Sequence, residues 1–596
     1  MRDTEVPVLV VGGGGCGLAA SVFLSEAGVR HLLVERREST SVLPRAHYLN
    51  QRTMEIFRQY GIADDVYGIS CPPENMSEVV WSTSLAGDGP VDARELHRME
   101  SFGGGSPTGA YAVDSTGPST NLPQHRLEPL LRRHAERRAP DSLLFHHEMT
   151  GFTQDEHGVT ARVTDRTTGE VSTVRARYLL GADGGRSVGK ALDVAMDGAG
   201  GGFTIISVHF SADLSRWWPG DKVLMTHIIS PEGEVSVVVA TGPRWGLASD
   251  EWALHFRVPP GAEADLGTAA IAVRVRELLK LPGDLDVRVH HVSEYRPEAV
   301  VARSFRAGRV FLAGDAAHRQ PPAAGGGLNT AVQDAHNLAW KLGAVLDGRA
   351  GEALLDSYEA ERLPVARRNV GWAMNCLLNY GVLFASLGVV HGRPEATRAN
   401  FAELLADTPL GQTRRTVVRE VFGTQRIEYQ AHDIELGHSY PAGAVVPDGT
   451  PPPPRDPTGA TYHPVTRPGH RLPHAWLRHG DTRVSTHDLV DGRAGFVLIT
   501  GPLSECWAVA AKKAEDTLGV PLTVVSVGGR AGAADYWDAD GTWTAVRGTG
   551  DDGAVLVRPD QHIAWRSAQA GPRVDQELGA ALRRILGRAD ATGTGS

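Results

Sequence analysis

A glycine-rich turn between a buried strand and a helix constrains the fold of this 596-residue chain more than any other feature. Gly12, Gly14 and Gly17 fit the pattern Gly-x-Gly-x-x-Gly of dinucleotide-binding βαβ units, and an apolar strand is predicted just before them at 8–11. The glycines allow a tight turn and a close approach to a pyrophosphate, and the following helix offers free N–H groups. The first segment is therefore predicted to bind a dinucleotide.

The acidic residue expected of such a unit is also present. After a helix that ends near Ala27, a second strand is predicted at 32–35, and Glu35 stands at its end. A carboxylate there can accept hydrogen bonds from ribose hydroxyls. Because this fingerprint alone does not distinguish NAD(P) from FAD, a plain NAD(P) dehydrogenase is one interpretation of this segment.

The patterning beyond residue 185 predicts further domains. Alternating strands such as 223–229 and 235–240 indicate an antiparallel sheet, and a strand, helix and strand after residue 496 indicate a third unit. The predicted fold class is α/β: a Rossmann-like nucleotide-binding domain, an inserted antiparallel-sheet domain and a C-terminal α/β domain. The predicted ranges are 1–185 and 301–400 for the two parts of the nucleotide-binding domain, 186–300 for the inserted sheet, 401–460 for a linker or extended crossing segment, and 461–590 for the C-terminal domain.

Composition narrows the classes of function. The net charge of −10 disfavours a nucleic-acid partner, since phosphate binding needs basic surface. Four cysteines lie far apart without a CxxC pair, which predicts neither a disulfide framework nor a metal site. No secretion signal is visible, and the apolar stretch 380–390 is too short to cross a bilayer. A cytoplasmic protein without a membrane partner is expected.

Two later motifs bear on the choice of nucleotide. Residues 181–187 read Gly-Ala-Asp-Gly-Gly-Arg-Ser, and residues 314–318 read Gly-Asp-Ala-Ala-His, followed by Pro322 and the glycines 325–327. Together with the first fingerprint they resemble the class A flavoprotein aromatic hydroxylases, the family with the para-hydroxybenzoate hydroxylase fold. The resemblance implies FAD as the cofactor, NADPH or NADH as a transient co-substrate, and O2.

The resemblance also implies which residues hold the flavin. Asp183 matches a position near flavin and nicotinamide, Asp315 one that binds the ribityl chain, and Arg45 and Gln124 match flavin-contacting positions. Arg126 is a weaker match. The predicted cofactor residues are Gly12, Gly14, Gly17, Glu35, Arg36, Arg45, Gln124, Asp183, Asp315, Pro322, Gly325, Gly327, Leu328 and Asn329.

The segments 50–55, 466–474 and 559–566 resemble the longer family members, among them chlorophenol hydroxylases and bacterial aromatic polyketide monooxygenases. Those members carry a thioredoxin-like C-terminal domain. Here that domain has only Cys506 after its first strand, so it is expected to be redox-inert and to have a structural or dimer-supporting role, with a homodimer as the assembly in view.

By resemblance, the expected reaction is hydroxylation of a phenolic or polycyclic aromatic substrate, of polyketide type, through a flavin C4a-hydroperoxide. Substrate-side candidates on or near the predicted sheet are His227, Tyr295, Trp245, His255 and Arg303, with His47 and Tyr48 beside Arg45. Two alternatives stay open: Baeyer–Villiger insertion of oxygen into a polycyclic quinone or ketone, and a flavin-binding interaction protein without turnover.

Overall fold

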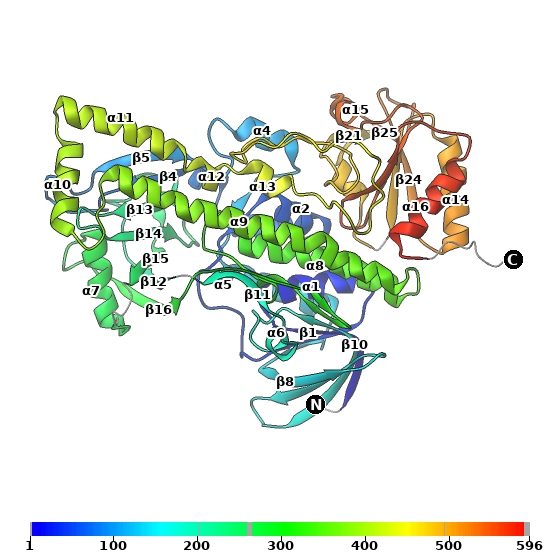
Figure 1. Cartoon of the computed structure of the whole chain (residues 1–596), viewed down its shortest axis with the longest axis horizontal. Helices are drawn as coiled ribbons and strands as arrows, with labels where there is room; N and C mark the ends of the chain where they lie inside the picture. The colour runs from blue at the N-terminus through cyan, green and yellow to red at the C-terminus, as the bar shows by residue number, and fades with distance from the viewer. Residues whose placement is uncertain (1–2, 201, 259–264, 494, 589–596) are drawn as a thin grey trace.

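The computed structural model describes residues 3–200, 202–258, 265–493 and 495–588, and it contains three packed units (Figure 1). The central unit is built on a sheet ordered β18-β19-β10-β1-β2-β7, with β9 and β8 continuing from β10. Its shorter or outer strands are β18 (Arg306–Ala307), β7 (Leu143–Phe145), β8 (His147–Gln154) and β9 (Val159–Asp165). Strands β1 (Thr4–Val11), β2 (His31–Glu35), β10 (Val171–Gly181) and β19 (Val310–Leu312) run parallel. This is the predicted Rossmann-like arrangement, with α1 (Gly15–Glu26) following β1.

The second unit is a seven-stranded sheet ordered β16-β12-β15-β14-β13-β4-β5. Its middle strands are β12 (Thr204–Ser211), β13 (Val223–Ile229), β14 (Val235–Ala240) and β15 (Glu251–Val258), and β16 (Arg288–Tyr295) forms one edge. The pairs among these strands are antiparallel, as predicted.

Two strands of this sheet come from outside the range predicted for it. The strands β4 (Glu78–Ser82) and β5 (Glu95–Glu100) belong to the segment 1–185, which we assigned wholly to the nucleotide-binding domain. That assignment is wrong for them, and β4 also pairs in parallel with β13, so the sheet is mixed. A parallel pair needs a long connection, and here the connection is residues 83–222, which include β10 of the central sheet.

Two long helices join the units. In Figure 1, α8 (Gly326–Leu346) and α9 (Asp356–Leu387) run across the middle of the molecule.

The stretch Glu352–Leu387 is long and apolar enough to cross a membrane, but core helices of soluble proteins can have the same length and composition. Here the buried residues of α9 include Tyr358, Ala366 and Leu383.

The segment 401–460 was predicted to be a linker or extended, and for its first part this is wrong. The chain forms α10 (Pro394–Leu405), α11 (Pro409–Gly423), α12 (Arg426–Tyr429) and α13 (His432–Leu436). Phe401 and Phe422 of these helices are buried in one hydrophobic cluster with side chains of α9 and of the seven-stranded sheet. The apolar face of this sheet is therefore covered by helices.

The C-terminal unit has the predicted thioredoxin-like pattern. Strand β23 (Phe496–Thr500) pairs in parallel with β24 (Leu522–Gly528) and antiparallel with β26 (Ala554–Val557), and α14 (Glu505–Leu518) packs against α16 (Val574–Ile585). Cys506 is exposed on α14, and the other cysteines lie buried elsewhere in the chain.

Buried charges join this unit to the rest of the chain. Glu361 of α9 accepts hydrogen bonds from Arg558 Nη1 (2.7 Å) and Nη2 (2.8 Å) and from Lys341 Nζ (2.7 Å), with all three side chains excluded from solvent. Trp340 of α8 meets Phe496 edge to face at 5.8 Å between ring centroids. The C-terminal unit is therefore attached to α8 and α9 through buried contacts.

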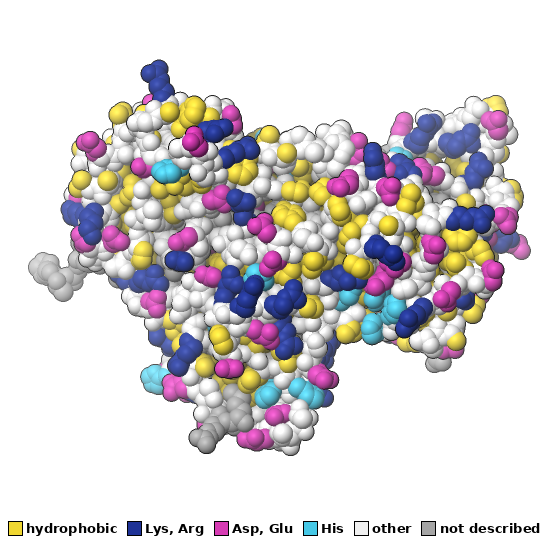
Figure 2. Space-filling view, turned by 180° about the vertical axis from the view of Figure 1, so that it is seen from behind, with side chains coloured by type: hydrophobic (Ala, Val, Ile, Leu, Met, Phe, Trp, Pro, Cys, Tyr) yellow, Lys and Arg dark blue, Asp and Glu magenta, His cyan; other side chains and the backbone are white. Residues whose placement is uncertain are grey.

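The surface carries both signs of charge. On the face shown in Figure 2, Lys and Arg side chains are interspersed with Asp and Glu, and neither positive nor negative side chains form one continuous patch. This distribution agrees with the modest net charge of the chain.

Candidate functional site

The predicted motifs meet at one edge of the central sheet. Val11 of β1 pairs with Gly181 of β10, and Gly181 pairs with Leu312 of β19. Because the carboxyl ends of these parallel strands coincide, the segments that follow them, which begin at Gly12, Ala182 and Ala313, lie side by side. Ligands of open α/β sheets bind at this edge.

The first turn is closed to any side chain larger than glycine. Gly12 has φ +112°, and a Cβ atom there would lie 2.3 Å from the carbonyl oxygen of Ala182. The N–H groups of the turn are held by two carboxylates: Gly13 donates to Glu35 Oε2 (2.8 Å) and Gly15 donates to Glu128 Oε1 (2.9 Å). Burial raises the pKa of Glu128, a residue the sequence analysis did not single out.

The two predicted aspartates differ in what they contact. Asp183 accepts hydrogen bonds within its own turn, from the N–H of Gly185 (3.0 Å), the N–H of Ser187 (2.6 Å) and the Ser187 hydroxyl (2.6 Å). Asp315 instead is exposed and lines a cavity. Of the two carboxylates, Asp315 is therefore the one that faces the cavity.

The N-terminus of α8 forms one wall of the same cavity. Gly325 has φ +56°, and a Cβ there would lie 2.8 Å from the ring of Tyr48. With its amide oxygen turned toward the helix, Gln320 accepts hydrogen bonds from the N–H groups of Gly327 (2.7 Å) and Gly326 (3.2 Å). These N–H groups can equally bind a carbonyl oxygen of a flavin ring.

The remaining predicted cofactor residues surround this edge. Asn329 uses its side chain inside the protein: Nδ2 donates to the Tyr48 and Gly325 carbonyls, and Oδ1 accepts from the N–H of Asn50. It therefore fixes the start of α8. Leu328 is 9% exposed beside Gly15, Arg36 is half-buried directly after Glu35, and Pro322 lines the cavity.

Arg45 and Gln124 lie next to each other on neighbouring loops. The N–H of Gln124 donates to the Arg45 carbonyl (2.8 Å). The Arg45 guanidinium lies over the Tyr295 ring, 5.4 Å from its centroid, and donates to Ser293 Oγ (3.0 Å). It thus connects the nucleotide-binding domain to β16. Arg126 forms an ion pair with Glu251 (2.9 Å) and does not line the cavity.

The cavity has a volume of about 480 Å³ and lies between the seven-stranded sheet, α9, α12 and the segment before α8. Its sheet side is largely apolar. The lining residues include Ile205, Met225, Val237, Val239, Phe256, Leu377 and Phe384, together with the polar side chains Arg45, His47, Tyr48, His227, His255, Tyr295, Asp315, Tyr380, Glu428 and Tyr429. An apolar cavity with a few convergent polar groups is typical of a binding site for a small organic molecule.

A hydrogen-bonded cluster of rings stands at one end of this cavity. His227 Nε2 lies 2.6 Å from the Tyr429 hydroxyl, which lies 3.0 Å from the Tyr380 hydroxyl. Burial lowers the pKa of His227 to about 3, so the imidazole is neutral near pH 7. Trp81 stacks against it at 5.2 Å and 12°. Burial also raises the pKa of the neighbouring Glu428 to about 7.

His47, Tyr48 and His255 line the cavity as well. His47 Nδ1 lies 2.9 Å from Asn121 Nδ2, and burial lowers the pKa of both histidines to about 4. Tyr48 donates its hydroxyl hydrogen to Glu435 Oε1 (2.8 Å), and burial raises the pKa of Glu435 to about 8. Tyr48 thus lies between the cavity and a carboxyl group that stays protonated at neutral pH.

This protonated carboxyl group makes stability depend on pH. In the folded protein Glu435 titrates near pH 8, and in the unfolded chain near its ordinary value of about 4.3. Between these values the unfolded chain releases a proton that the folded protein retains, so the free energy of unfolding falls as pH rises from about 4.3 to about 8. We expect the free energy of unfolding of Glu435→Gln to fall less than that of the parent as pH rises over this range.

This difference in the pH-dependent loss of unfolding free energy between Glu435→Gln and the parent should reach a few kcal/mol at pH 8, at about 1.4 kcal/mol per pKa unit. Urea unfolding at pH 5, 6, 7 and 8 measures it. Glu395, exposed on α10, provides the control variant Glu395→Gln, which should follow the parent at every pH. A constant offset between Glu435→Gln and the parent would contradict the expectation.

Two sequence candidates lie away from the cavity. The ring of Trp245 packs beside Gly242, where an added Cβ would lie 2.6 Å from it, and exposed Arg303 forms an ion pair with Asp197 (2.6 Å). Conversely, the sequence analysis missed Tyr380, Glu428 and Tyr429. The last two lie on a four-residue helix in the segment predicted to be a linker, where no motif marks them.

Fold and site together define a class of protein: a nucleotide-binding α/β enzyme with a largely apolar cavity against its seven-stranded sheet (the substrate sheet). The comparisons with known proteins agree. Residues 5–373 match the family described as FAD binding domain, and residues 465–589 match the aromatic-ring hydroxylase C-terminal domain. The chain therefore belongs to the FAD-dependent aromatic hydroxylases and is a flavin-dependent monooxygenase, with FAD, NAD(P)H and O2 as in these enzymes.

Relatives of similar length extend over nearly the whole chain. It is 36% identical to 2,4-dichlorophenol 6-monooxygenase of Delftia acidovorans, covering 98% of both proteins. It is also 36% identical to tetracenomycin A2 monooxygenase-dioxygenase of Streptomyces glaucescens, covering 100% of this chain and 99% of the relative. Among solved structures, the flavin-dependent monooxygenase PieE in complex with FAD and substrate has a TM-score of 0.92 at 41% identity, covering 99% of this chain and 100% of PieE. Aklavinone-11 hydroxylase with FAD and aklavinone has a TM-score of 0.78 at 31% identity, with the same coverage.

Proposed function

We propose that this enzyme hydroxylates a polycyclic phenolic or quinonoid aromatic of polyketide type. The observation that carries the proposal is the cavity of about 480 Å³, which has a broad apolar side formed by the sheet and a neutral His227 with two tyrosines at one end. The similarity to proteins described as putative polyketide hydroxylases of Streptomyces supports the same substrate class.

The ring cluster would prepare a phenol for attack by oxygen. Bound FAD, reduced by NAD(P)H, supplies the activation of O2. A phenol becomes more electron-rich when its hydroxyl proton leaves. That proton can pass from Tyr429 to Tyr380, whose hydroxyl oxygens lie 3.0 Å apart, and on to Glu428, whose pKa of about 7 suits a base at neutral pH. His227, whose pKa is lowered to about 3, is too weak a base for this step and holds the Tyr429 hydroxyl in place at 2.6 Å. A chain of proton acceptors beside the cavity favours hydroxylation of a phenol over Baeyer–Villiger insertion, which attacks a carbonyl carbon.

The first experiment measures NADPH and NADH oxidation by the purified holoenzyme with monocyclic chlorophenols and with polycyclic phenols and quinones. We expect polycycles to stimulate oxidation more strongly and to gain one oxygen with the carbon skeleton intact, as shown by mass and fragmentation. Oxygen inserted into a C–C bond would establish the Baeyer–Villiger alternative. A flavin-bound enzyme that no aromatic stimulates would support the interaction protein without turnover.

The relay makes a separate prediction. Tyr429→Phe should lower kcat about 100-fold near pH 7, the smaller end of typical general acid–base effects. The loss should shrink at high pH, where the phenol ionises without help. His97→Asn, on the same sheet but outside the cavity lining, is the control and should keep the parental profile. A loss that is the same at every pH would indicate a structural role for Tyr429.

For the cofactor, we propose that the predicted residues at the carboxyl edge of the central sheet bind FAD, with Glu35 at the adenosine ribose, Asp315 at the ribityl chain and the start of α8 at the flavin ring. Asp315→Asn should weaken FAD binding about 10- to 100-fold, the equivalent of a charge-assisted hydrogen bond. Titration of the apoprotein with FAD measures this. Asp197→Asn, on the surface, should bind FAD as the parent does.

We also propose that the enzyme works in the cytoplasm as a protein without nucleic-acid or membrane partners. The mixed surface charge and the burial of one side of α9 support this. A homodimer stays a prediction, which light scattering of the eluting holoenzyme tests directly.

A further inference from the structure

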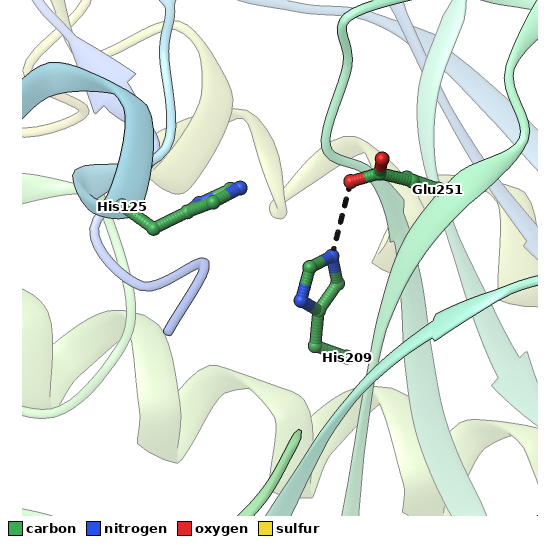
Figure 3. A group of neighbouring side chains, drawn as sticks. All are labelled: His125, His209 and Glu251. Carbon is green, nitrogen blue, oxygen red and sulfur yellow. Dashed lines mark hydrogen bonds and ion pairs between the residues drawn. The ribbon is translucent and has the colours of Figure 1, made fainter. Parts of the chain in front are cut away.

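Three side chains that could ligate a metal ion lie between the nucleotide-binding domain and the substrate sheet. His125 is the second residue of α5 (Gln124–Arg138), His209 lies on β12 and Glu251 begins β15. Taking one ligand atom from each residue, all three atoms lie within 4.8 Å of one another. Figure 3 shows the three side chains converging on a common space. None of them lines the cavity described above.

The ring nitrogens of this group lack partners. Within the ranges that the structure describes, both nitrogens of His125 and Nδ1 of His209 are buried without a hydrogen bond. His209 is 7% exposed, and its Nε2 reaches Glu251 Oε2 at 3.2 Å. Buried polar atoms are normally satisfied, so a His125 ring without any partner, beside a second ring with a free nitrogen, indicates a missing partner that would take one nitrogen from each ring.

We propose that His125, His209 and Glu251 form a binding site for a divalent transition-metal ion, with Zn²⁺ as the preferred class. Two imidazoles and one carboxylate are a common zinc donor set, with a fourth position left for water. With bonds of about 2.0 Å, the ligand atoms of a tetrahedral site lie about 3.3 Å apart, so the present spacing requires a small inward rotation of the side chains.

One neighbour opposes the metal. Arg126 donates to Glu251 Oε2 (2.9 Å) and also to the carbonyls of Thr241 (3.0 Å) and Gly242 (2.8 Å). An incoming ion would compete with this guanidinium for the carboxylate. Arg126 can keep its two carbonyl contacts when it releases Glu251, so metal binding does not leave it without partners.

The position of the site suggests what the metal would do. His125 directly follows Gln124, which contacts the Arg45 loop, whereas His209 and Glu251 belong to the substrate sheet. A bound ion would therefore fasten the start of α5 to this sheet. The expected consequence is a more stable junction between the two domains, with the chemistry still performed by the flavin.

The test uses the full-length holoenzyme, treated with a chelator and then titrated calorimetrically with Zn²⁺ at pH 7.5. We expect one ion per chain and a raised Tm. His125→Asn and Glu251→Gln should each weaken binding by at least about tenfold. His391→Asn removes an exposed histidine elsewhere and should leave the affinity unchanged. Uptake that survives both ligand variants, or that falls equally in the control, would overturn the proposal.

Cobalt provides a readout that does not depend on the variants folding. Co²⁺ bound by the parent enzyme should give visible absorption bands of a four-coordinate site, and stoichiometric Zn²⁺ should abolish them. The bands must be read by difference from the flavin spectrum before and after Co²⁺ addition. An enzyme that shows no such bands and takes up no ion in the calorimeter lacks the site.

Discussion

Replacing Gly12 by alanine is expected to yield a protein that purifies largely without flavin. The added Cβ would lie 2.3 Å from the Ala182 carbonyl oxygen, and φ +112° is unfavourable for any residue with a side chain. The turn must then move away from the segment after β10, and the start of α1, at the proposed FAD site, moves with it. Backbone strain of about 1–3 kcal/mol corresponds to an affinity loss of roughly 10- to 100-fold.

The structure offers a matched control for this change. Gly28 also has a positive φ, +74°, but an added Cβ there meets no atom within 4 Å. Gly28→Ala should therefore lose some stability and keep its flavin. The flavin-to-protein absorbance ratio after purification, followed by FAD titration of the apoproteins, separates the two outcomes. Equal flavin content in both variants would show that the contact with Ala182 does not matter.

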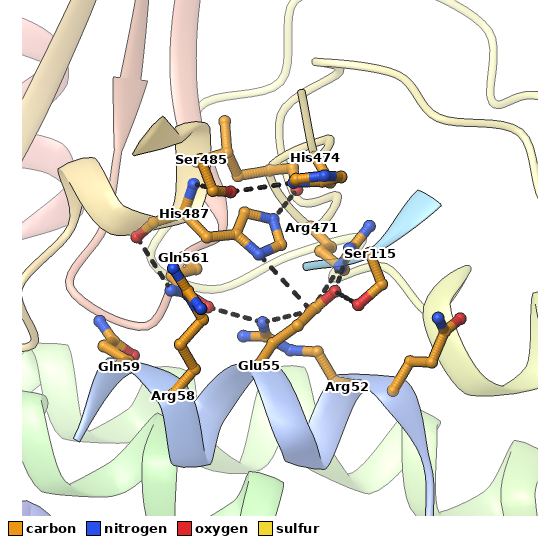
Figure 4. A network of polar contacts seen from close by, with 12 residues as sticks. Arg52, Glu55, Arg58, Gln59, Ser115, Arg471, His474, Ser485, His487 and Gln561 are labelled. Carbon is orange, nitrogen blue, oxygen red and sulfur yellow. Dashed lines mark hydrogen bonds and ion pairs between the residues drawn. The ribbon is translucent and has the colours of Figure 1, made fainter. Parts of the chain in front are cut away.

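Replacing Glu55 by alanine should destabilise the whole protein by about 3–5 kcal/mol, the range for breaking a buried ion pair. Glu55 lies on α2 (Gln51–Gln59) and is fully buried (Figure 4). Its carboxylate accepts hydrogen bonds from Arg471 and from Arg52 (3.1 Å). Without it, two guanidinium groups stay buried next to each other and unneutralised.

The protonation of Glu55 agrees with this role. Burial alone would raise its pKa, but the charges of Arg471, His487 and Arg52 outweigh burial and hold the pKa below its ordinary range. The stability that Glu55 contributes is therefore present at neutral pH and is lost at pH values below its ordinary pKa. Urea unfolding at pH 7 measures the effect.

Arg58 on the same helix supplies the control. It forms an ion pair with Asp488 of the C-terminal unit (2.8 Å), but its side chain is 42% exposed. Exposed pairs contribute about 0–1 kcal/mol, so Arg58→Ala should be nearly neutral. If both variants lost the same stability, the burial of Glu55 could not be the cause.

The sequence predicted those parts of the fold that depend on local pattern. The glycine turn lies between β1 and α1, and β13 and β14 have the predicted bounds, because short apolar runs between turn residues identify strands directly. Helix α8 begins at Gly326, inside the glycine stretch 325–327, since glycines weaken the helical pattern without preventing a helix.

What the sequence could not predict depends on long-range contacts. Nothing local places β4 and β5 in the substrate sheet, because β4 pairs with β13 far along the chain and β5 joins the sheet only through β4. The same holds for the site. Motifs lead to Asp315, but Tyr429 reaches the cavity only because α12 packs against the sheet, and His125 meets His209 only through the junction between two domains.

The buried contacts of the C-terminal unit limit how this enzyme can be divided. Helix α8 spans about 30 Å from the proposed flavin site toward Trp340 and Lys341. A chain shortened before residue 461 would expose Trp340 to water and leave Glu361 without Arg558. Gene fusions and shortened versions of this enzyme therefore have to keep the C-terminal unit, because the residues of the central unit that contact it are apolar or charged groups that need its partners.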